Sequence, residues 1–128
     1  MDVRYPIGRL EVPATVTRRH IDSWLEEIAQ YIQNLRKTVA NLSQDEWVKL
    51  ADSDLPIEVS IQMLDAINQR VVAIGQHLTE KELARDFVLE GSGATTVGET
   101  VAKLSWHARH HLAHIQIALG ELEVNDAL

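Results

Sequence analysis

Four of the chain's six histidines lie close together near its C-terminal end, at His107, His110, His111 and His114. On an α-helix these four side chains share one side, within an arc of roughly 100°, at the edge of an apolar stripe. Two pairs have the i, i+4 spacing: His107 with His111, and His110 with His114. This spacing places two imidazoles one turn apart, so both can bind one Zn²⁺ or similar borderline metal at about 2.0–2.1 Å. The histidine cluster therefore predicts a metal site, with either pair as ligands.

The sequence gives less support to other kinds of chemistry than metal binding. A second interpretation of the histidine cluster is a pH-sensitive interface, because imidazoles titrate near a pKa of about 6.5. A zincin helix is not indicated, since no glutamate stands between His110 and His114. The chain has no cysteine, which excludes disulfides, a thiolate nucleophile and a thiolate metal site.

Length and composition indicate one globular domain over residues 1–128. The hydrophobic content of 45% is enough for a packed core. A net charge of −7 argues against binding to nucleic acid or to an anionic membrane. No apolar run approaches the length of a membrane span, and the first residues lack the apolar core of a signal peptide. We therefore expect a cytoplasmic protein.

The hydrophobic periodicity predicts three long amphipathic helices and no strand. Residues 1–16 hold Pro6, Gly8 and Pro13 and are expected to form an extended arm, and residues 121–128 a short tail. The apolar stripe of each helix is broad, which predicts either a further helix from a partner chain or an exposed apolar groove. The predicted helices run from a Thr17 cap to about Asn41, from about Ile57 to Leu78 after Pro56, and from a Thr95 or Thr96 cap to about Leu119 before Gly120.

Two connectors join these helices. The first, Asn41 to Pro56, is expected to hold a short helical turn that begins at Ser43. The second, Thr79 to Thr96, has a capping-box pattern at its start and a Gly-Ser-Gly turn near its end. His77 is expected to lie in the last turn of its helix, near the negative end of the helix dipole, and not to bind a metal.

Two stretches carry a resemblance to a known family. The arm sequence Arg-Tyr-Pro-Ile-Gly at 4–8 and the sequence Trp-His-Ala-Arg-His-His-Leu-Ala-His-Ile at 106–115 resemble the opening and the closing metal motif of the YfiT branch of the DinB/YfiT superfamily. The resemblance implies a four-helix bundle, often dimeric, that holds one Zn or Ni ion per chain with three histidines. On the family motif two ligands fall on His110 and His114, with His107 and His111 as reserve candidates.

The third ligand of the family comes from a second helix that this sequence lacks. After Leu42-Ser43-Gln44 the sequence passes directly to what resembles the stretch before the family's third helix. We therefore expect an all-α, up-down helical bundle of DinB/YfiT type that has three long helices, one fewer than the family, and is completed by dimerisation.

Three functions follow as expectations from the resemblance. The first is a metal-dependent hydrolase, in which the metal held by the last helix activates water for attack on a small-molecule substrate. The second is a low-molecular-weight-thiol S-transferase of the bacillithiol type that uses the same metal site. The third is a non-catalytic shortened relative that acts as a helical dimerisation or interaction protein. In each case the expected protein partner is a second copy of the chain.

Overall fold

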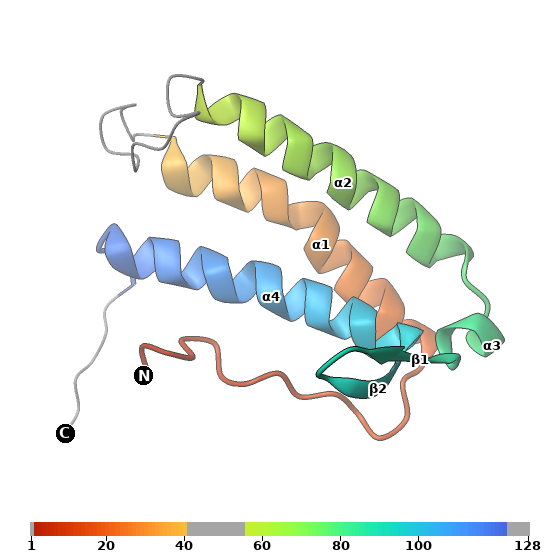
Figure 1. The fold of residues 1–128 in the computed structure, drawn as a ribbon. Helices are drawn as coiled ribbons and strands as arrows, with labels where there is room; N and C mark the ends of the chain where they lie inside the picture. The colour runs from red at the N-terminus through yellow and green to blue at the C-terminus, as the bar shows by residue number, and fades with distance from the viewer. Residues whose placement is uncertain (1, 41–55, 123–128) are drawn as a thin grey trace.

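Three long helices lie side by side in the computed structural model, which describes residues 2–40 and 56–122 (Figure 1). They are α1 (Arg18–Val39), α2 (Ile57–His77) and α4 (Val97–Ala118). Helix α1 packs against both others, whereas α2 and α4 scarcely touch each other. The chain runs along α1, returns along α2 and runs again in the first direction along α4. The predicted bundle of three long helices is confirmed.

The helix ends agree with the signals in the sequence. Thr17 caps α1, and Thr96 caps α4 by accepting a hydrogen bond from the backbone N–H of Glu99 at 3.0 Å. Gly120 follows α4 with a φ of 75°, a left-handed conformation that glycine adopts without strain. The short helix α3 (Glu80–Leu83) begins with the predicted capping box. The expected turn at Ser43 lies outside the described residues.

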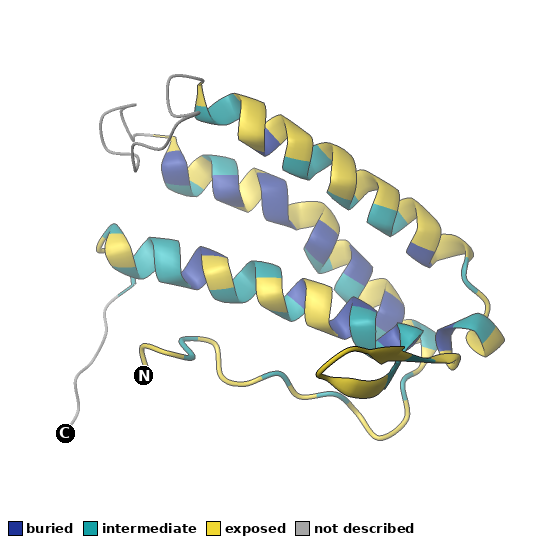
Figure 2. Ribbon diagram, viewed as in Figure 1, coloured by how far each residue is buried: buried dark blue, intermediate teal, exposed yellow. Residues whose placement is uncertain are grey.

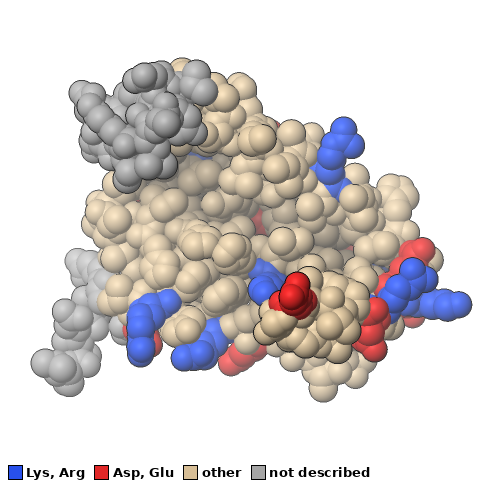
Figure 3. Space-filling view, viewed as in Figure 1, with Lys and Arg blue, Asp and Glu red and all other residues tan. Residues whose placement is uncertain are grey.

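Buried residues lie mainly on α4 and on α1, the helix between the other two, while α2 is mostly exposed (Figure 2). The exposed positions on α2 include large apolar side chains, among them Met63 at 70% and Ile74 at 62% exposure. Figure 3 shows that charged side chains lie mainly along one rim and one end of this view, and that the face over the three helices is largely uncharged. The apolar surface that the broad stripes predict is therefore present on α2.

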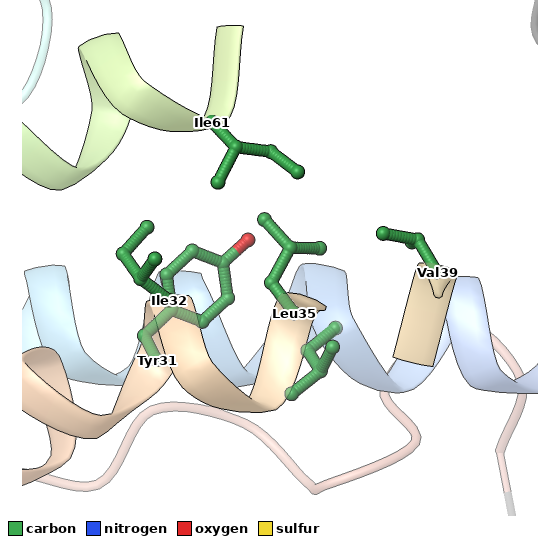
Figure 4. Packing of buried hydrophobic residues seen from close by; sticks show 6 residues of the cluster. Tyr31, Ile32, Leu35, Val39 and Ile61 are labelled. Carbon is green, nitrogen blue, oxygen red and sulfur yellow. The ribbon is translucent and has the colours of Figure 1, made fainter. Parts of the chain in front are cut away.

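The core consists of two clusters along α1. One cluster joins the C-terminal half of α1 to Ile61 of α2 and Leu112 of α4 (Figure 4). The other joins the N-terminal half of α1 to Leu83 and Val101. Gly75 of α2 allows a close approach beside the second cluster, because a Cβ there would lie 2.6 Å from Leu25 Cδ2.

Polar contacts fix the ends of α1 to α2. The guanidinium of Arg18 donates to the carbonyls of Gly75 and Leu78 at 3.1 and 3.0 Å, which satisfies acceptors at the end of α2. At the other end, Arg36 donates to Glu58 at 2.5 Å. Together these contacts set how α2 lies along α1.

One prediction is wrong: residues 86–96 form a β-hairpin. Strands β1 (Asp86–Leu89) and β2 (Gly93–Thr96) pair antiparallel, with Phe87 opposite Thr95. Aromatic and β-branched residues on both sides of a glycine turn favour such a hairpin. Each strand has only four residues and little burial, so the alternation that marks a longer strand is missing from the sequence.

The arm before α1 contains no helix or strand between residues 2 and 17, as predicted, and runs alongside α4 (Figure 1). The indole N–H of Trp106 donates to the carbonyl of Gly8 at 3.1 Å, which anchors the arm on α4. In the part of the chain that the structure describes, no helix combines the length and apolarity needed to cross a membrane.

Candidate metal centre

All four residues of the histidine cluster lie on α4, but its two i, i+4 pairs face different surroundings. His107 and His111 are exposed, whereas His110 and His114 are half-buried. The first pair lines a groove between the three long helices. The second pair lies toward the N-terminal arm, where Tyr5 approaches the ring of His110. The pairs are therefore separate candidates for a metal site.

The structure brings the nitrogens of His107 and His111 together. Their Nε2 atoms lie 2.8 Å apart, and their rings are nearly perpendicular, at 71°. Two nitrogens bound tetrahedrally to one zinc at about 2.0–2.1 Å lie roughly 3.3 Å apart. In the metal-free chain one of these nitrogens donates to the other, so a metal would replace that hydrogen, with both Nε2 atoms deprotonated and about 0.5 Å farther apart.

His110 and His114 have different partners from the first pair. The Nε2 of His114 lies 2.8 Å from the carbonyl oxygen of Val3, and because a carbonyl only accepts, this nitrogen donates. His110 stacks on Trp106, with ring centroids 4.5 Å apart. Its Nδ1 is buried without a hydrogen-bond partner among the described residues. The rings of His110 and His114 lie about as close as those of the first pair, with centroids 4.4 Å apart at 74°, but the Nε2 of His114 is directed to the arm.

Desolvation and mutual repulsion favour the neutral form of two histidines in the cluster. The pKa of His110 is lowered from its ordinary value, first by burial and then by the charges that His114, His111 and His107 would carry. Partial desolvation also lowers the pKa of His111, although its side chain is largely exposed, with further contributions from His107 and His114. A neutral imidazole has the free lone pair that a metal needs.

The described residues supply no third ligand beside either pair. Within 2–40 and 56–122, no group of three or more His, Asp or Glu side chains is arranged to hold a metal ion. His20 belongs instead to the start of α1, where its Nδ1 accepts from the backbone N–H of Thr17 at 3.0 Å. His77 lies in the last turn of α2 with its Nδ1 2.7 Å from the carbonyl of Ala73, in the place predicted for it.

A polar group behind the cluster was not predicted from the sequence. Ser105, which is 1% exposed, donates its hydroxyl hydrogen to a carboxylate oxygen of Glu27. The Nε of Arg109 lies 3.2 Å from the same oxygen. Ser105 stands four residues after Val101 on the apolar stripe of α4. A polar residue in that stripe indicates a buried hydrogen bond, and the sequence could have shown it. The contacts fix α4 against α1 and so orient the histidines.

The groove beside His107 and His111 is largely apolar and has a volume of about 390 Å³. Its lining side chains come from all three long helices, α1, α2 and α4. The lining residues include no Asp, Glu, Lys or Arg; they are Ile28, Tyr31, Leu64, Ile67, Asn68, Val71, Leu104, His107, Ala108 and His111.

The three-helix fold and the histidines on α4 agree with the family to which the sequence can be matched. Residues 13–115 match the DinB superfamily, and the chain belongs to that family.

Named relatives extend the match over almost the whole chain. A protein of Oceanobacillus iheyensis named "Putative metal-dependent hydrolase" is 35% identical, over 93% of this chain and 96% of its own length. A protein of Halalkalibacterium halodurans with the same name is 27% identical, over 93% and 98%. YfiT from Bacillus subtilis, described as having an unusual four-helix bundle topology, superposes with a TM-score of 0.80 at 16% identity, over 94% of this chain and 99% of that chain. This likeness supports the fold.

The comparison also agrees with the shortened bundle predicted from the sequence. The alignment with the Oceanobacillus protein extends over 167 positions, although this chain has 128 residues. The relative therefore has several tens of residues, within the aligned span, that have no counterpart here. That number of residues is large enough for one helix and its connections.

Proposed function

We propose that the chain is a metal-dependent hydrolase whose divalent metal, Zn²⁺ or Ni²⁺, is held by His107 and His111. The observation that supports this assignment is the 2.8 Å separation of their Nε2 atoms. Imidazole nitrogens suit both metals. The names of the relatives support the reaction class. The pair His110 and His114, which the family resemblance suggests, remains the alternative ligand set.

The residues of the chain would have distinct roles in this site. A metal held there would lower the pKa of a bound water and so supply the nucleophile for hydrolysis. His107 and His111 would bind the metal, and the salt link of Glu27 to Arg109 would keep α4 in the orientation that exposes both imidazoles. Two protein ligands leave more positions to solvent than the three of an ordinary catalytic zinc site. We therefore expect weaker metal binding than in a three-histidine site.

Metal content and activity test this proposal together. The purified protein is stripped with a chelator, reloaded with Zn²⁺ or Ni²⁺, dialysed and analysed for bound metal and for hydrolysis of small esters and amides. We expect about one metal per chain in the wild type and in a His77→Ala control. The double variant His107→Ala, His111→Ala should lose both metal and activity. Unchanged metal content in that variant would overturn the assignment of the ligands.

The same preparation separates hydrolysis from thiol transfer. If the metal activates a low-molecular-weight thiol and not water, product will form only when the thiol is added: the thiolate will attack the ester carbonyl, the alcohol will leave, and a thioester will replace the carboxylic acid as product. No observation on the described residues favours this alternative, which would use the same two histidines.

We also propose that two copies of the chain associate through α2. The observation that favours this is the row of exposed apolar side chains Val59, Met63 and Ile74, which lies outside the groove. Exposed apolar patches are typical of interaction sites. If the chain proves to bind no metal, this association would be its remaining function.

A further inference from the structure

The groove between α2 and α4 has the size and shape of a small-molecule site. Its volume of about 390 Å³ lies within the range of roughly 300–1,000 Å³ that ligand pockets occupy. It stays open because α2 and α4 scarcely touch each other. Side chains at its edge remain exposed although they are apolar, with Leu104 at 42% and Ile67 at 52% exposure.

The groove changes in polarity along its length. At one end the lining side chains are apolar. This end lies beside the core cluster that contains Ile28, against which Val71 packs. The other end lies beside the core cluster that contains Tyr31, against which Leu64 packs, and it includes the polar side chains of Tyr31 and His111. His111 lies toward this second end, seven residues after Leu104 on the same helix, which corresponds to about 10 Å along the axis.

We propose that this groove binds an uncharged hydrocarbon group of the substrate, with the reacting group beside His107 and His111. The hydrocarbon group lies toward Leu104, Ile28 and Val71 and covers apolar surface that is otherwise in contact with water. This assignment of a substrate class rests on the proposed function for the reaction. The binding of the hydrocarbon group itself needs only the groove.

The lining favours this occupant over two others. A charged group would lose its hydration without gaining an ion pair, because no charged side chain lines the groove. A second copy of the chain would need a larger surface than the groove. The exposed apolar side chains that could form such an interface, Met63 and Ile74, do not line the groove.

Binding of an uncharged fluorescent probe, N-phenyl-1-naphthylamine, to the full metal-free chain tests the proposal. We expect saturable binding and displacement by 1-octanol but not by ethanol at the same concentration. Leu104→Glu places a carboxylate in the groove and should weaken binding roughly tenfold or more. Val88→Glu is the matched control, since Val88 is 76% exposed on β1 and does not line the groove.

A second variant and a second measurement keep the outcomes distinct. Leu104→Trp fills the groove without adding charge and should also reduce binding, which decides the question if Leu104→Glu does not fold by circular dichroism. Equal binding by wild type and both Leu104 variants would overturn the proposal, as would an equal loss in Val88→Glu. A dimer that takes up no probe and dissociates in Leu104→Glu would show that a second copy fills the groove, and would also overturn it.

Failure of this inference can be told apart from failure of the proposed function. The double variant His107→Ala, His111→Ala should lose metal but keep probe binding. Leu104→Trp should lose probe binding but keep metal. A metal-binding protein that takes up no probe would overturn only the groove assignment.

Discussion

The Nε2 of His114 lies 2.8 Å from the carbonyl oxygen of Val3, a residue 111 positions earlier in the chain. This contact ties the N-terminal arm to the last helix. It also distinguishes the two histidine pairs, because the nitrogen of His114 that would otherwise be free donates to the backbone. His107 and His111 have no such tie to the arm, and their Nε2 atoms face each other.

Removing the imidazole of His114 should therefore release the arm and leave the metal in place. Arg4 and Arg9 lie on the arm and are exposed, so trypsin can report its release. In His114→Ala we expect cleavage at these arginines several times faster than in the wild type, with unchanged metal content. His77→Ala is the control for losing a histidine elsewhere. Loss of metal in His114→Ala with no change in cleavage would assign His114 to the metal site instead.

The buried contact of Ser105 with Glu27 should matter for stability. Glu27→Ala leaves the hydroxyl of Ser105 buried without its acceptor, which costs about 1–3 kcal/mol. Glu26→Ala, on the exposed side of the same helix, should change the free energy of unfolding by less than about 0.5 kcal/mol. Urea denaturation of both variants gives the comparison.

A double variant checks the cause of that loss. Because Ser105→Ala removes the buried hydroxyl, Glu27→Ala combined with Ser105→Ala should be less destabilised than the sum of the two single variants. Strictly additive effects would mean that the hydroxyl and the carboxylate stabilise the fold independently.

Local signals in the sequence predicted the long helices well. Thr17, Thr96 and Gly120 have side chains or backbone freedom that act within one turn, so they mark the helix ends without any knowledge of the fold. The hairpin at 86–96 was missed because its strands are short and its side chains mostly exposed. A strand with no buried face gives no periodic pattern to read.

The candidate site was only partly predictable for a related reason. Helical spacing placed His107, His110, His111 and His114 on one side of α4, as the structure has them. The difference between the pairs depends on what packs beside α4, namely the arm on one side and the groove on the other. Contacts of this kind join residues tens of positions apart, and 111 positions for Val3 and His114, so no local pattern encodes them.

Acidification should destabilise the metal-free protein between neutral pH and about pH 5. The pKa values of His110 and His111 are lowered in the folded state, whereas in the unfolded chain histidine titrates at about 6.5. Between the lowered pKa values and 6.5 the unfolded chain binds more protons, so the free energy of unfolding falls as the pH falls. Urea denaturation at pH 8, 7, 6 and 5 measures this slope.

Asparagine variants identify the groups responsible for the slope. In His110→Asn, His111→Asn we expect a flatter dependence on pH over the same range, because asparagine does not titrate. A wild-type protein that becomes more stable on acidification would contradict the direction of both pKa shifts.

Self-association through α2 gives the last prediction. Met63 is 70% exposed in the middle of the apolar row on α2, and a carboxylate at this position would be buried without a partner in a dimer that uses this face. We expect the wild type to have the mass of a dimer by light scattering at micromolar concentration, and Met63→Glu to have the mass of a monomer. Gln62→Glu adds the same charge one position away, outside that row, and should remain dimeric.

Because a stable interface needs about 800 Å² per partner, a wild type that stays monomeric would mean that α2 alone does not provide enough surface. A dimer that persists in Met63→Glu would instead place the interface on another face.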